Sequence, residues 1–200
     1  MILPKAMLYF DTARLHLRAF MAADAAGMFA LDSDPAVHRY LGGIGGQMVS
    51  SLEQSAATVA FIQAQYAANG IGRWAVLLRE TGEFMGWAGL ELMAGPVNEQ
   101  HHFYDLGYRF RPQFWRQGYG YEAAQAWFDY GFQPLKLPRI CAYADVENQA
   151  SCRILEKIGL QPGNEFAEAG VRCRWFEADA PTGAHAGPAH GQSMPVQENA

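Results

Sequence analysis

The segment Trp115–Tyr121 (WRQGYGY) carries residue types that are suited to binding an anion. Gly118 and Gly120 have no Cβ, so backbone N–H groups can approach a ligand closely and the chain can adopt positive φ. A helix is predicted to begin close behind them, and the exposed N–H groups of its first turn add partial positive charge. Arg116 could add a full charge. A phosphate or pyrophosphate is therefore the ligand that this segment predicts.

Three interpretations compete for these glycines. No Gly-Lys-Ser/Thr triplet follows any glycine, which excludes a P-loop. Gly118, Gly120 and Ala123 fit the GxGxxA of a dinucleotide-binding fingerprint. However, a Pro-Gln-Phe-Trp-Arg-Gln spacer separates them from the preceding strand, and the acidic partner is missing near the offset of about 20 residues. The third interpretation, a glycine turn without a ligand, is favoured for an isolated GxG.

A second motif lies downstream, in Ala144–Leu160 (ADVENQASCRILEKIGL). Asn148 is a good N-cap for a short helix, and Gly159 stands where such a helix would stop. Ser151 falls in the first turn of that helix. Taken alone, Asn148 is simply a helix cap and Ser151 a solvated residue. Together with the glycine segment, which lies one helix and one strand upstream, they form a much more specific pattern.

The elements that would position these residues follow from hydrophobic periodicity and from turn residues. Strands are predicted at 14–20, 74–79, 84–92, 103–110, 139–144 and 171–177, and helices at about 22–31, 53–68, 121–132 and 149–158. Hairpin strands followed by alternating helices and strands imply a mixed sheet with helices on both faces. We expect one domain over residues 1–180, a flexible connection at Gly42–Gln47, and a disordered tail over residues 181–200.

Composition narrows the class of protein. With 200 residues, half of them hydrophobic, the chain can bury a substantial core. The net charge of −5 argues against a general nucleic-acid binder. Three cysteines without CxxC spacing suggest neither a disulfide framework nor a metal site. The N-terminus does not resemble a signal peptide, and no apolar run approaches the length of a membrane span. We therefore expect a cytoplasmic protein that binds neither nucleic acid nor membrane.

Both motifs resemble the GNAT superfamily, and within it the branch of the ribosomal-protein-alanine N-acetyltransferases. That branch carries a pattern like P-x-x-W-x-x-G-[YW]-[GA]-x-E-A, matched by Pro112, Trp115, Gly118, Tyr119, Gly120, Glu122 and Ala123. It also carries N-x-x-S-x-x-x-x-E-K-x-G-[FL], matched by Asn148, Ser151, Glu156, Lys157, Gly159 and Leu160. The similarity runs from about Arg14 to Glu177.

This resemblance implies an α/β (α+β) fold with a mixed, mostly antiparallel sheet of about six or seven strands. A splayed strand pair in that sheet would bind acetyl-CoA, the acyl donor, without a metal ion. The strand of that pair which meets the pantetheine arm would be Asp105–Arg111, with Tyr108 to Arg111 beside the arm, and the glycine segment would hold the pyrophosphate. The implied cofactor-binding residues are Tyr108, Phe110, Arg111, Arg116, Gln117, Gly118, Tyr119, Gly120, Tyr121, Asn148 and Ser151.

The implied reaction is direct attack of a primary amine on the thioester, which requires a general base. Asp105 is the first candidate for the base and Glu91 the second, whereas His101 and His102 fall in a predicted hairpin turn and are expected to be solvated. Ser151 is the candidate acid, with Tyr143 a weaker one. The tyrosine that the family often places on the downstream helix is missing here.

The acceptor amine stays open at this stage. A small molecule and a protein N-terminus are both compatible with the resemblance, and so is a homodimer. Two other functions are retained as alternatives. One is a catalytically inactive acyl-CoA-binding sensor or scaffold, because no base is unambiguous. The other is a dinucleotide-binding oxidoreductase, built on the GxGxxA match.

Overall fold

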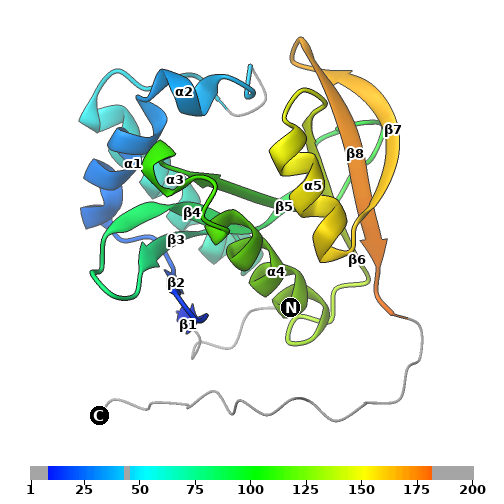
Figure 1. Cartoon of the computed structure of the whole chain (residues 1–200), viewed down its shortest axis with the longest axis horizontal. Coiled ribbons are helices and arrows are strands. Elements are labelled where there is room, and N and C mark those ends of the chain that lie inside the picture. Colours follow the sequence, from blue (N-terminus) through cyan, green and yellow to red (C-terminus); the bar gives the residue numbers. More distant parts are fainter. Residues whose placement is uncertain (1–8, 43–45, 182–200) are drawn as a thin grey trace.

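The computed structural model describes residues 9–42 and 46–181, which form an open, mainly antiparallel sheet with helices on both faces (Figure 1). The strand order in the sheet is β1-β2-β3-β4-β5-β6-β8-β7. The strands are β1 (Tyr9–Asp11), β2 (Leu15–Arg18), β3 (Arg73–Leu78), β4 (Phe84–Met93), β5 (Phe103–Phe110), β6 (Arg139–Asp145), β7 (Gln161–Glu168) and β8 (Val171–Asp179). Residues 43–45 of the predicted connection and residues 182–200 of the predicted tail lie outside the described residues.

Helices cover both faces of the sheet, and successive side chains along a strand pack alternately against the helices of one face and of the other. The helices are α1 (Ala25–Asp32), α2 (Pro35–His38), α3 (Leu52–Asn69), α4 (Tyr119–Phe132) and α5 (Gln149–Ile158), with 3-10 turns at Ala22–Asp24 and Pro112–Phe114. On β3, Trp74 and Val76 pack in one core with α4 and α5, whereas Ala75 between them packs in another core with α1 and α3. This alternation is expected of a strand that is covered on both faces. The predicted mixed sheet is confirmed.

Two strands go beyond the six that periodicity predicts, giving eight in the described residues. β1 is only three residues long, and β7 contains Pro162 and Gly163 and is largely exposed at an edge of the sheet. Neither shows the regular apolar alternation that marks a half-buried strand. A further difference concerns α4, which begins at Tyr119 rather than Tyr121, because Gly118 takes the N-cap position with φ of 83°.

The sheet opens between β5 and β6, as the resemblance implied. β5 pairs with β4 along its whole length, from Gly86↔Phe110 to Met93↔Phe103. In contrast, β5 and β6 are parallel and pair at Asp105↔Cys141 alone. The two strands therefore diverge beyond Asp105, and the backbone of the second half of β5 has no strand partner on that side.

Packing of α4 holds the start of this helix in place at the opening. Trp127, which is 1% exposed, meets Trp74 edge-on with ring centroids 5.0 Å apart. Phe10 and Tyr130 complete the aromatic cluster, each with its centroid within 5.5 Å of Trp127. Such edge-to-face contacts add about 0.5–1.5 kcal/mol per pair beyond the burial of apolar area. Trp127 therefore anchors α4 in the core.

Gly86→Ala should lower the free energy of unfolding by about 3 kcal/mol. Gly86 has φ of 154°, and a Cβ there would clash with the backbone carbonyl of Arg109 on β5. Urea unfolding followed by circular dichroism measures the loss. Gly95→Ala is the matched control, because nothing lies within 4 Å of its Cβ position, and it should change stability by less than about 0.5 kcal/mol. Equal effects would contradict the assigned close approach of β4 and β5.

Candidate active site

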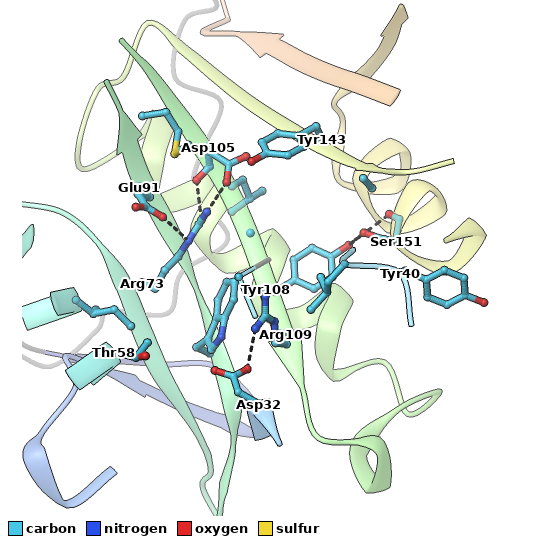
Figure 2. A pocket seen from close by; sticks show the side chains of 18 of the residues that line it. Asp32, Tyr40, Thr58, Arg73, Glu91, Asp105, Tyr108, Arg109, Tyr143 and Ser151 are labelled. Carbon is cyan, nitrogen blue, oxygen red and sulfur yellow. Dashed lines mark hydrogen bonds and ion pairs between the residues drawn. The ribbon is translucent and has the colours of Figure 1, made fainter. Parts of the chain in front are cut away.

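A cavity of about 510 Å³ lies where β5 and β6 diverge. One side is formed by α1, α3, β4 and β5, and the other by the end of β6 and the first turn of α5 (Figure 2). The cavity brings together six of the residues singled out in the sequence, which are Glu91, Asp105, Tyr108, Tyr143, Asn148 and Ser151. With Arg73 of β3, residues from seven elements converge on one space.

One guanidinium connects the two predicted base residues. Arg73 on β3 makes a charged hydrogen bond from Nη2 to the Asp105 carboxylate and a second from Nη1 to the Asp105 carbonyl oxygen at 2.7 Å. Its Nε lies 3.3 Å from the carboxylate of Glu91, which also accepts a 2.6 Å hydrogen bond from Gln65. Figure 2 shows Arg73 between the two carboxylates. The acids are cross-strand neighbours, because Glu91 on β4 pairs with Asp105 on β5.

Sequence reasoning missed Arg73, which precedes the predicted strand by one residue. The residue that makes room for it is Gly107, since a Cβ at this position would lie 2.9 Å from the Arg73 Cζ. A glycine inside a predicted strand signals a close approach of another group. That signal is present in the sequence, but it does not identify the group that approaches.

Burial raises the pKa of two groups in the cavity, Asp105 and Tyr143. It raises the pKa of Asp105, which is 7% exposed, and the neighbouring Glu91 charge raises it further, while the charge and hydrogen bond of Arg73 oppose the increase. The Glu91 side chain is 24% exposed and so is the more accessible of the two acids. Burial also raises the pKa of Tyr143, with a further contribution from Asp105, toward which Tyr143 points in Figure 2. Tyr143 is therefore a protonated phenol at neutral pH.

On the other side of the cavity, two hydroxyl groups meet. The Tyr108 hydroxyl on β5 lies 3.1 Å from Ser151 Oγ in the first turn of α5. Burial raises the pKa of Tyr108, and the hydrogen bond with Ser151 opposes this. Asn148 Oδ1 accepts the Ser151 N–H at 3.2 Å, so the predicted N-cap is confirmed. The helix α5 itself contains no tyrosine, but the hydroxyl of Tyr108 on β5 reaches its first turn.

The glycine segment has the shape of an anion cradle. Arg116 and Gly118 have φ of 59° and 83°, which turns the chain sharply into α4. In the described part of the chain, no hydrogen bond is made by the backbone N–H groups from Arg116 to Tyr121. Gly120 packs closely, since a Cβ there would lie 3.4 Å from Ile154. Free N–H groups beside a glycine are what a pyrophosphate requires.

Several predicted cofactor residues can offer only their backbone to a ligand. Phe110 is buried in the core, and its carbonyl accepts a 2.6 Å hydrogen bond from the Trp115 indole, which makes Trp115 a loop anchor. The Arg111 side chain pairs with Glu83 at 3.1 Å. The Gln117 side chain donates to the carbonyl of Gln113.

The aromatic residues of the loop are held by cations. The guanidinium of Arg14 lies 4.2 Å from the Tyr119 ring centroid, and the ammonium of Lys157 lies 4.1 Å from that of Tyr121. His101 and His102 are exposed between β4 and β5, away from the cavity lining, as predicted.

Glu122 fastens the loop to the N-terminal strands. Its carboxylate accepts hydrogen bonds from Thr12 Oγ1 at 2.6 Å and from Arg14 Nε at 2.7 Å, and Arg14 also donates to the carbonyl of Gln117 at 2.9 Å. These contacts reach across more than 100 residues of sequence, and they fix the loop from outside the helix.

No group of three His, Cys, Asp or Glu side chains within residues 9–42 and 46–181 is arranged to hold a metal ion. Within the same ranges, no helix has the length and apolar character needed to cross a membrane. Cys141, Cys152 and Cys173 are buried free thiols.

Glu122→Gln should destabilise the protein in a pH-dependent way. Burial raises the pKa of Glu122, but hydrogen bonds from Thr12 and Arg14 outweigh burial and lower it below its usual value near 4.5. The ionised group therefore stabilises the fold above that value, and its contribution disappears as the pH falls through the lowered pKa. Urea unfolding should show a loss of about 1 kcal/mol at pH 7 that shrinks toward pH 3. Glu80→Gln is the exposed control. A loss independent of pH would contradict this role of the charge.

Comparison with known proteins identifies the family. The model of the GNAT acetyltransferase domain matches residues 14–161, which is more than half of the chain. The uncharacterized N-acetyltransferase YoaA of Bacillus subtilis is 34% identical over 151 residues, covering 76% of this chain and 81% of YoaA. The uncharacterized protein YkkB of the same organism is 33% identical over 150 residues, covering 74% of this chain and 83% of YkkB.

Solved structures have the same architecture. A GNAT-family acetyltransferase from Bacillus anthracis superposes with a TM-score of 0.71 at 26% identity, covering 86% of this chain and 98% of that protein. RimL, a ribosomal-protein α-N-acetyltransferase in complex with coenzyme A, gives a TM-score of 0.70 at 17% identity, covering 84% and 95% of the two chains, which is a likeness of fold alone. The resemblance found in the two sequence motifs is thereby confirmed, and the chain belongs to the GNAT acetyltransferase family.

Proposed function

We propose that this protein transfers the acetyl group of acetyl-CoA to a primary amine. One observation carries the proposal. The opening between β5 and β6 leads into the same cavity that contains the paired carboxylates Asp105 and Glu91. A donor site and a proton acceptor therefore share one space. The GNAT family membership supports the same reaction class.

The residues at the opening fit coenzyme A. The free N–H groups of the loop from Arg116 to Tyr121 would hold the pyrophosphate. The stretch from Tyr108 to Arg111, on the side of β5 that faces away from β4 and has no strand partner, would accompany the pantetheine. Asn148 and Ser151 border the opening from α5. Bound acetyl-CoA supplies the acetyl group as an activated thioester.

Asp105 is the proposed general base, with Glu91 as the second candidate. A carboxyl group whose pKa is raised toward neutral is a better base than an ordinary one. The charge and the hydrogen bond of Arg73 oppose this increase and so favour the ionised form of Asp105. Asp105 is nearly buried, so proton transfer from the amine would pass through a water molecule or through the more exposed Glu91. Asp105 and Glu91, which both pair with Arg73, would share the removal of the proton from the amine.

Ser151 is the proposed acid for the departing thiolate, with Tyr108 behind it. Their hydroxyl oxygens lie 3.1 Å apart, so Tyr108 can donate a hydrogen bond to Ser151 while Ser151 gives its own proton to the thiolate, and solvent would then reprotonate Ser151. Burial raises the pKa of Tyr108, so this phenol is protonated at neutral pH. A thiolate is a good leaving group and needs only modest assistance. Tyr143, on the opposite side beside Asp105, is less suited to this role.

The two alternative functions have weaker support. Gly118 follows a 3-10 turn rather than the end of a strand, which does not fit the dinucleotide fingerprint that an oxidoreductase would use. A sensor or scaffold without turnover would retain the donor site, so only a kinetic assay separates it from an enzyme. Release of coenzyme A with none of a panel of amines would favour the sensor.

Gly120→Glu should abolish binding of acetyl-CoA. The new side chain would meet Ile154 and Tyr108 and would place a negative charge beside the pyrophosphate site. Isothermal titration calorimetry should show at least a 100-fold weaker affinity, a difference of about 2.7 kcal/mol. Gly95→Glu adds the same side chain in open space and should bind acetyl-CoA normally. Unchanged affinity in Gly120→Glu would refute the assignment of the loop.

Asp105→Asn should lower kcat about 100-fold at pH 7 while leaving acetyl-CoA affinity intact. The wild-type rate should fall as the pH drops through the raised pKa of Asp105, because the base must be ionised. The variant should recover at high pH, where the amine has already lost its proton. Asp129→Asn is the control, since burial also raises the pKa of Asp129 but this residue lies outside the cavity lining.

The same experiment includes Glu91→Gln. A wild-type rate in Asp105→Asn across the pH range would remove Asp105 from the mechanism. A loss confined to Glu91→Gln would transfer the role of base to that residue. Thermal unfolding of each variant establishes that it is folded, which matters because Asp105→Asn leaves a buried guanidinium with one carboxylate fewer.

A further inference from the structure

The acceptor side of the cavity has apolar walls. They are contributed by α1, the segment after α2, α3 and β4, and the residues are Met28, Leu41, Phe61, Ile62, Trp87 and Met93. Phe61 on α3 is 64% exposed, although large aromatic side chains are usually buried. An exposed aromatic ring that also lines a cavity is suited to contact an apolar ligand.

The two cations of the cavity lining are already engaged. Arg73 binds Asp105 and Glu91. Arg109 on β5 donates to Asp32 on α1 at 2.7 Å, and both side chains of this pair are about one-tenth exposed. Both guanidiniums also lie over the ring of Trp87, at 5.3 Å and 5.1 Å from its centroid. Each arginine is therefore held by carboxylate and by aromatic contacts.

The charge balance of the cavity is negative. Among the described lining residues, four carry a carboxylate and two carry a guanidinium, namely Asp32, Glu91, Asp105 and Asp145 against Arg73 and Arg109. A positively charged amine is attracted to such a site. A carboxylate or phosphate on the acceptor would be desolvated next to other negative charges, which is unfavourable. The two guanidiniums that could pair with it already bind aspartate and glutamate side chains.

We propose that the acceptor is a small arylalkyl primary amine without an acidic group. This inference rests on the proposed acetyl transfer and specifies its substrate class. The ammonium group of the acceptor lies beside the carboxylates of Glu91 and Asp105. The aromatic ring of the acceptor contacts Phe61 and the neighbouring apolar side chains. Charge excludes amino acids as acceptors, and the apolar wall selects against polyamines.

The test compares kcat/KM for matched acceptors by release of coenzyme A. 2-Phenylethylamine is the reference, phenylalanine adds a carboxylate, and phenylalanine amide adds a neutral group of the same size. Phenylalanine should react at least about 30-fold less efficiently than its amide. 1,4-Diaminobutane and an alanine-led peptide should both be poorer than 2-phenylethylamine. Phenylalanine equal to its amide, or a preference for the diamine or the peptide, would overturn the proposal.

Variants test the aromatic contact separately. Phe61→Ala should lower kcat/KM for 2-phenylethylamine about 10-fold and change that for ethylamine little, because ethylamine has no ring. Leu52→Ala, at the start of the same helix, removes an apolar side chain of 49% exposure that does not line the cavity, and it should behave as wild type. Equal losses for both amines in Phe61→Ala would exclude a ring contact. No transfer to any amine would instead refute the proposed function itself.

Discussion

The arrangement of the central strands depends on the contacts of one buried cation, the guanidinium of Arg73, with the strands β4 and β5. A buried charge is costly unless it is paired and its hydrogen bonds are satisfied. From β3, Arg73 reaches the Gly89 carbonyl on β4 and both the carbonyl and the carboxylate of Asp105 on β5. A one-residue slip of any of these strands would leave the cation unpaired. Gly107 is the complementary requirement, since no side chain fits in the space that Arg73 occupies.

In the described residues, the same ion pair lies at the single position where β5 and β6 pair in the sheet. Asp105 pairs with Cys141, and beyond this residue the two strands separate. The carboxylate is consequently fixed at the apex of the opening, between the strands that border the proposed donor site and the helices that border the proposed acceptor side. Asp105 therefore both pairs with Arg73 in the fold and carries the proposed role of general base. This position explains why a proposed base can be nearly buried and still lie in the cavity lining.

Local motifs were predictable from the sequence, and long-range contacts were not. The turn at Gly118, the cap at Asn148 and the stop at Gly159 depend on a few neighbouring residues, and each lies where it was expected. Arg73 and Tyr108 act through partners 32 and 43 residues away, which no local pattern reveals. β7 was missed for another reason, because a largely exposed edge strand carries no clear apolar alternation.

The contacts of Glu122 have a consequence for the order of assembly. Arg14 and Glu122 are 108 residues apart in the sequence. The glycine segment therefore acquires its final shape only after the turn between β1 and β2 and the start of α4 are both in place. Closing such long loops is slow in folding, because the chain loses entropy before the contact is gained. A ribosome-bound chain that ends before α4 would lack the loop altogether. Local opening of the first strands would release it again, so ligand affinity would report on the attachment of a segment far away in the sequence.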